Sequence, residues 1–163
     1  VVCDVLAGLR QCHEMGIVHG DIKPESILFK KDTRGNPFAK LSELGLAWLR
    51  NDLGLGFVSG TDESQNFKAP ELAQTRTPSP QADVYATGVL FYGLLTGSLP
   101  FSPEPGKQSS LNAPPDNHLP ISQRNPEIPQ ALSHIVEKAL RHKPEERWQN
   151  AAQMLQAILE MRF

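Results

Sequence analysis

Apolar side chains recur every three or four positions at the start of the chain and in its last third, a spacing typical of amphipathic helices. In the opening segment they are Val2, Val5, Leu6, Leu9 and Cys12. This pattern predicts a first helix that ends near Met15 and Gly16, where the periodicity stops. Residues 130–140 carry a similar face, made of Leu132, Ile135, Val136 and Ala139.

Capping residues place the last two helices. Pro129 is expected at the first helical position of the helix over 130–140, because proline lacks only an N–H that would be unpaired there. Asn150 is a favourable N-cap residue. A last helix is predicted after it, with inward side chains at Ala151, Met154, Leu155 and Ile158.

Residues 83–95 are apolar on nearly every side, which indicates a helix buried at the centre of a helical domain. Short apolar runs at 17–18, 27–29 and 39–41 predict strands, with a turn over 32–37. The expected fold is therefore mainly α, a helical bundle around a buried central helix. A small β-hairpin is expected beside the loop that follows the first helix.

Two segments are predicted to be irregular. Residues 48–67 show no sustained period and hold three glycines before Asp62, which suits a surface loop. Residues 100–129 contain eight of the fourteen prolines. We expect a stiffened loop there, inside one domain that spans residues 1–163.

Composition narrows the possible partners. The 163 residues are 39% hydrophobic and 21% charged, and the formal net charge is −2. This balance disfavours nucleic acid and anionic membranes as partners, because both call for a strongly basic face. No apolar run approaches the roughly 18 residues of a membrane span. The spacing of Cys3 and Cys12 suggests neither a metal site nor a disulfide framework, so a reducing cytoplasm is expected.

The candidate chemistry lies in the loop after the first helix. Asp21 is followed two residues later by Lys23, and a second carboxylate, Glu43, comes about twenty residues on. Such a set can orient a hydroxyl group and hold a metal ion. Each residue taken alone is more often an ordinary solvated charge.

The ordered motifs resemble those of protein kinases. His19 to Phe29 reads His-Gly-Asp-Ile-Lys-Pro-Glu-Ser-Ile-Leu-Phe, similar to the catalytic-loop signature H-R-D-L-K-P-E-N. Residues 40–47 resemble the D-F-G segment, and 69–71 read Ala-Pro-Glu. The order and spacing resemble the C-terminal lobe of the α+β kinase fold, most similar to bacterial serine/threonine kinases.

The resemblance implies roles for the loop residues. Asp21 would accept the proton of the substrate hydroxyl, and Lys23 would lie near the transferring phosphoryl group. His19 is expected to be a core strut that meets Leu44. Leu28 would support the adenine of a nucleotide from below.

The metal-binding positions depart from the kinase pattern. Glu43 takes the place of the metal-binding Asp, and Ser26 takes the place of the Asn. Mg²⁺ demands near-octahedral geometry at about 2.0–2.1 Å, which a longer carboxylate and a short hydroxyl satisfy poorly. Gly20 also replaces the usual arginine. The resemblance gives three other residues structural roles: an ion pair of Glu71 with Arg147, and bonds from Asp83 to the catalytic-loop backbone.

Three functions follow as alternatives. The first is a catalytically impaired, pseudokinase-like C-terminal lobe that serves as a regulatory or binding module. The second is a fragment of an active, atypical serine/threonine kinase. The third is an interaction scaffold without a ligand. The sequence starts without Met, which suggests a fragment of a longer parent protein. It holds no Gly-rich loop or V-A-I-K lysine, so the N-terminal lobe that clamps the nucleotide phosphates is absent from residues 1–163. We expect Mg-ATP to bind only in an intact parent kinase and not to this chain alone. The expected binding partner of the chain is another protein or another domain of the parent chain.

Overall fold

The computed structural model describes residues 1–45, 62–75, 77–101 and 118–161, and the structural statements below concern these residues. The α-helices are α1 (Val2–Glu14), α3 (Leu72–Thr75), α4 (Pro80–Thr96), α5 (Ile121–Arg124), α6 (Gln130–Ala139) and α7 (Ala151–Leu159). Short 3-10 helices are η1 (Pro24–Ser26), η2 (Asp62–Phe67) and η3 (Pro144–Glu146), and the strands are β1 (Ile27–Lys31) and β2 (Pro37–Leu41). The predicted mainly helical fold with one small hairpin is confirmed.

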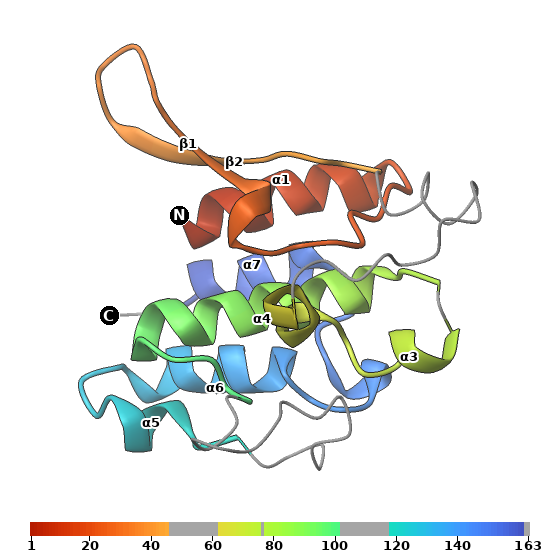
Figure 1. The fold of residues 1–163 in the computed structure, drawn as a ribbon. Helices are drawn as coiled ribbons and strands as arrows, with labels where there is room; N and C mark the ends of the chain where they lie inside the picture. Colours follow the sequence, from red (N-terminus) through yellow and green to blue (C-terminus); the bar gives the residue numbers. More distant parts are fainter. Residues whose placement is uncertain (46–61, 76, 102–117, 162–163) are drawn as a thin grey trace.

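Helix α4 is the centre of the molecule, between α1 and α7 on one side and α6 on the other (Figure 1). It is buried from Ala82 to Tyr92. It starts earlier than the predicted residue 83, because the Ser79 hydroxyl accepts a hydrogen bond from the Ala82 N–H and Pro80 takes the first helical position. The last turn is exposed, with Leu94 at 58%.

The predicted terminal helices are present. Helix α1 buries Val5, Leu6 and Leu9 completely and packs against α7. The side chain of Asn150 caps α7 by accepting a hydrogen bond from the Gln153 N–H. Pro129 lies one position before α6 instead of inside it.

Strands β1 and β2 form an antiparallel hairpin in register from Ile27 opposite Leu41 to Lys31 opposite Pro37. The hairpin projects past α1 (Figure 1). The middle of β2 is tied to α1, because the Ala39 N–H donates to the Asp4 carboxylate at 3.1 Å. The hairpin joins the two loops that hold the candidate site residues.

Three sequence-based expectations need correction. Residues 17–18 are not a strand: the Ile17 N–H closes the end of α1 by donating to the Cys12 carbonyl at 2.8 Å. Residues 62–67 form η2, and α5 lies inside the segment expected to be irregular. Residues 48–61 of the first loop and 102–117 of the second lie outside the described residues. Among the described helices, none is both long and apolar enough to span a bilayer.

Candidate functional site

The loop between α1 and η1 is anchored from the central helix. The Asp83 carboxylate, 1% exposed, accepts hydrogen bonds from the backbone N–H groups of His19 and Gly20, each at 2.8 Å. Gly20 has a φ of 77°, a left-handed conformation that a side chain disfavours. A glycine therefore suits the loop conformation at the position where the kinase signature has arginine.

A residue that the sequence reasoning missed completes this anchor. His13 donates from Nε2 to Asp83 at 3.0 Å, and its Nδ1 accepts a hydrogen bond from the Ala151 N–H at 3.2 Å. One imidazole therefore ties the end of α1 to both α4 and the first residue of α7. Its polar position in the last turn of an apolar helix is the only sequence signal, and that signal does not name its partners.

His19 is fully buried behind the loop. Its Nε2 lies 2.9 Å from the Ser42 carbonyl, and its Nδ1 accepts a hydrogen bond from the Asp21 N–H at 3.3 Å. The imidazole thus connects the loop to the end of β2. Leu44, its expected partner, is 46% exposed.

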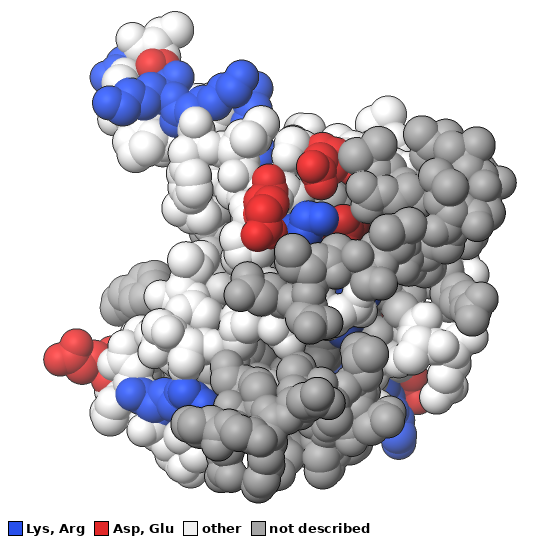
Figure 2. Space-filling model, viewed as in Figure 1, with Lys and Arg blue, Asp and Glu red and all other residues white. Residues whose placement is uncertain are grey.

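Three charged side chains meet at the open side of the loop. The Lys23 ammonium is 2.6 Å from the Asp21 carboxylate and 3.9 Å from the Glu43 carboxylate. Asp21 and Lys23 are each 16% exposed, whereas Glu43 is 41% exposed. The structure therefore brings the three predicted residues together, with the cation between the two anions. Figure 2 shows red and blue side chains in contact on this face, beside the projecting hairpin.

Glu43 has a strained backbone. Its φ of 64° lies in the left-handed region, which costs a residue with a Cβ about 1–2 kcal/mol. Such strain is often found at functional sites.

Ser26 lies behind the site and is fully buried. Its hydroxyl donates to the Lys23 carbonyl at 2.8 Å and accepts from the Lys23 N–H at 3.1 Å. Both bonds stabilise η1, in which Pro24 takes the first position. The predicted metal-ligand hydroxyl is thus already used by the loop backbone.

These residues do not fit a two-metal site. The Ser26 hydroxyl is committed to Lys23, and the Lys23 ammonium already lies against the carboxylates of Asp21 and Glu43. Within the described ranges, no group of three or more His, Cys, Asp or Glu side chains is placed to hold a metal ion. Leu28, the expected adenine support, lies on β1 and is 47% exposed.

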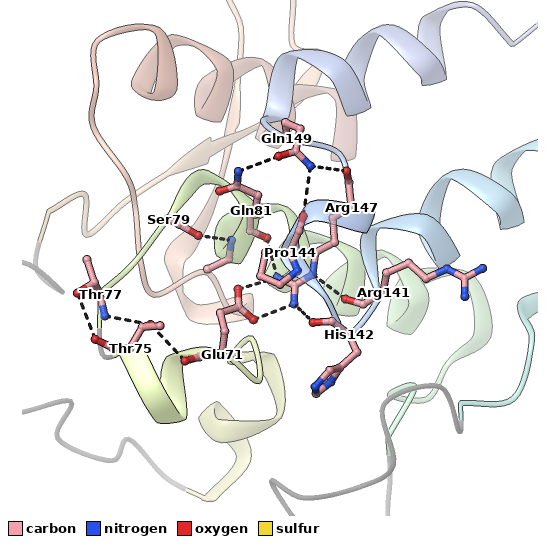
Figure 3. Close-up of polar contacts among 11 residues, drawn as sticks. Glu71, Thr75, Thr77, Ser79, Gln81, Arg141, His142, Pro144, Arg147 and Gln149 are labelled. Atoms are coloured by element: carbon pink, nitrogen blue, oxygen red, sulfur yellow. Dashed lines mark hydrogen bonds and ion pairs between the residues drawn. The ribbon is translucent and has the colours of Figure 1, made fainter.

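The Glu71 carboxylate and the Arg147 guanidinium form a double hydrogen bond of 2.7 and 2.8 Å (Figure 3). Arg147 also donates to the carbonyls of Arg141, His142 and Gln81. The side chain of Arg147 is fully buried and that of Glu71 is 17% exposed. The pair ties the segment before α3 to the segment around η3.

Arg147 lies over the Tyr85 ring, with the guanidinium carbon 4.8 Å from the ring centroid. Burial raises the pKa of the Tyr85 phenol far above its ordinary value, while the nearby Arg147 cation opposes that shift. Burial together with the Asp83 charge likewise raises the pKa of the Cys12 thiol. Both shifts come from the interior around α4 and not from the open site.

A buried central helix, a hairpin and an aspartate–lysine loop anchored by Asp83 together define the class: a protein kinase fold. The family description "Protein kinase domain" matches residues 1–159, and the chain belongs to this family.

Curated relatives are bacterial serine/threonine kinases. The chain is 37% identical to serine/threonine-protein kinase Pkn1 of Myxococcus xanthus over 96% of this chain and 22% of the relative. It is 33% identical to serine/threonine-protein kinase PkaA of Streptomyces coelicolor, over 98% of this chain and 29% of the relative. The chain thus spans less than a third of each relative.

A solved structure shares the fold. The crystal structure of Rad53 1-466 in complex with AMP-PNP aligns with a TM-score of 0.72 and 24% identity, over 98% of this chain and 39% of that one. At this identity the likeness concerns the fold alone.

Proposed function

We propose that this chain is the C-terminal lobe of a catalytically impaired, bacterial-type serine/threonine kinase, and that it acts as a regulatory or binding module for a protein partner or for another domain of its parent. The observation that carries the proposal is the Ser26 hydroxyl, which is bonded to both backbone groups of Lys23. A ligand set for two Mg²⁺ ions is needed to neutralise the charge on a transferring phosphoryl group. The cysteine spacing supports a cytoplasmic setting, as part of the same proposal.

The second metal-ligand position, Glu43, also supports catalytic impairment. The Glu43 carboxylate lies 3.9 Å from the Lys23 ammonium, on a side chain one methylene longer than that of the aspartate in the kinase pattern. Mg²⁺ demands near-octahedral geometry, which the longer side chain satisfies poorly. The Lys23 ammonium supplies a positive charge to Asp21 and Glu43 without a metal ion. We therefore expect Mg-ATP to bind only in an intact parent protein and not to this chain alone.

The test is titration calorimetry of the chain with Mg-ATP at millimolar concentration. We expect no binding heat and no phosphoryl transfer. In the parent protein with an N-terminal lobe, Ser26→Asn combined with Glu43→Asp should raise phosphoryl transfer, and Glu25→Gln is a matched surface control. A rate of about 1 per second or more in the unmodified parent, the ordinary range for kinases, contradicts the proposal.

A second candidate function is that of a fragment of an active, atypical serine/threonine kinase. It is favoured by the retention of Asp21 and Lys23, the residue types that a substrate base and a phosphate-binding cation need. Their side chains lie together in the loop, with the Lys23 ammonium 2.6 Å from the Asp21 carboxylate. The same rate measurement separates the two candidates. In an active parent, Asp21→Asn abolishes transfer, whereas in an impaired parent it changes nothing measurable.

A further inference from the structure

We propose that the hairpin arm, residues 27–41, binds an extended acidic segment of a protein partner, which adds to the outer edge of β1 as a third strand. This rests on the proposed function and deepens it, because it names the surface that binds the protein partner and the chemistry of that partner; peptide binding is measured independently of phosphoryl transfer, so the two can fail separately. The proposal depends on the charge of the arm, on the free backbone groups of β1 and on an exposed aromatic side chain.

The arm is strongly basic although the chain as a whole is acidic. Its exposed cations are Lys30, Lys31, Arg34 and Lys40. The formal net charge of the whole chain, by contrast, is −2. Within the part of the chain that the structure describes, none of the four pairs with a carboxylate. Figure 2 shows these blue side chains gathered on the projecting hairpin, away from the rest of the surface.

The single acidic residue of the arm serves the turn. Asp32 Oδ1 accepts hydrogen bonds from the N–H groups of Arg34 and Asn36 at 2.8 Å, and Oδ2 accepts from the Asn36 amide at 3.1 Å. These bonds lower the pKa of Asp32, so the carboxylate is ionised and directed into the turn. The four cations are therefore available to carboxylates of another molecule.

The hydrogen-bond pattern shows which groups of β1 point outward. The Asp32 N–H donates to the Asn36 carbonyl at one end of the ladder, and the Ser42 N–H donates to the Ser26 carbonyl at the other. These are hydrogen-bonded pairs, and between them hydrogen-bonded and non-hydrogen-bonded pairs alternate, as in any antiparallel ladder. Phe29 opposite Ala39 is then a non-hydrogen-bonded pair, in agreement with the Ala39 N–H, which points away to Asp4.

Lys31 opposite Pro37 is of the same type, and Pro37 has no N–H to give. The N–H and C=O groups of Phe29 and Lys31 therefore face outward from β1, where no described residue covers them. Such an edge is a template for an added strand.

The same strand carries an exposed aromatic ring, since the Phe29 side chain is 66% exposed. An extended polypeptide can satisfy all three features: its backbone bonds to Phe29 and Lys31, its carboxylates meet the cations, and an apolar side chain covers the ring. A phosphodiester backbone or a lipid headgroup meets the cations but offers no alternating N–H and C=O groups. These differences favour an acidic polypeptide.

Fluorescence anisotropy with a labelled decapeptide of alternating glutamate and valine tests the proposal on the full chain. Lys30→Glu with Lys31→Glu should weaken binding at least tenfold. Arg10→Glu with Lys143→Glu is the matched control, since it changes the net charge equally at positions whose side chains are 44% and 63% exposed, and it should change affinity less than twofold. If the reversal impairs folding, Lys30→Gln with Lys31→Gln replaces it.

A second peptide distinguishes strand addition from charge attraction alone. The same decapeptide with alternate backbone nitrogens methylated keeps its charge but loses its edge hydrogen bonds, and should bind at least tenfold more weakly. Equal binding of the two peptides, or no binding at about 1 mM, overturns the proposal. The proposal is also overturned if the chain binds phosphatidylserine vesicles or duplex DNA more tightly than it binds the peptide, and if Lys30→Glu with Lys31→Glu abolishes that binding.

Discussion

The carboxylate of Glu71 and the guanidinium of Arg147 form a two-point ion pair across 76 positions of sequence. Every N–H of the guanidinium has an oxygen partner, from either Glu71 or a backbone carbonyl. Removing the carboxylate leaves a fully buried cation without its counter-charge.

We therefore predict that Glu71→Ala lowers the free energy of unfolding by about 3 kcal/mol. Denaturant titration measures the loss. The control is Glu146→Ala, because that side chain is 48% exposed and its pair with Lys143 should contribute no more than about 1 kcal/mol. An unchanged unfolding midpoint for Glu71→Ala contradicts a structural role for the pair.

His13 provides the second prediction. Replacing it with alanine removes the bonds to Asp83 and to the Ala151 N–H, and leaves a buried carboxylate with one donor fewer. We expect a loss of about 2 kcal/mol in stability. The amides of His19 and Gly20 should also exchange faster with solvent, since Asp83 is their acceptor. The exposed His134→Ala is the control, and equal effects of the two variants contradict the prediction.

Glu43 should be replaceable with a gain in stability. Glycine takes a positive φ without strain, so Glu43→Gly is expected to raise the free energy of unfolding by about 1 kcal/mol. Glu25→Gly, in η1 and without a positive φ, should lower it. Thermal melts of the two variants give opposite signs if strain at Glu43 is real, and the same sign if it is not.

Tyr85 predicts a dependence on alkaline pH. Its pKa is raised in the folded state above the ordinary value of 10.0, so the unfolded chain loses this proton first as pH rises. The folded state binds more protons above pH 10, and stability falls there by up to about 1.4 kcal/mol per pH unit. Below pH 10 the contribution is fully present.

Tyr85→Phe removes this dependence. The other titrating groups are the same in both proteins, so their contributions cancel when the unfolding free energies of wild type and variant are subtracted at each pH. Denaturant midpoints at pH 9, 10 and 11 measure it. Parallel curves for wild type and variant contradict a raised pKa for Tyr85.

Local pattern was sufficient to predict much of the fold. The apolar faces of α1 and α7 follow the helical period, and Asn150 is an N-cap residue whose side chain forms the expected bond. The strand expected at residues 17–18 failed because two apolar residues do not specify a strand without a pairing partner. Helix α5 was not predicted, because four residues are too few to show a helical repeat of apolar positions.

The sequence by itself determined the kinase resemblance, the helical periodicity and the identity of the charged residues, because motifs and periods are properties of neighbouring positions. The resemblance also implied the pair of Glu71 with Arg147 and the bonds of Asp83 to the loop backbone, which the structure contains. Only the tertiary structure decided the partners of residues to which the resemblance gave none or another role. His13 meets Ala151 across 138 positions, and the Lys23 ammonium lies between two carboxylates that belong to different loops. Such contacts depend on how helices and loops approach one another in space, and no spacing along the chain encodes that approach directly.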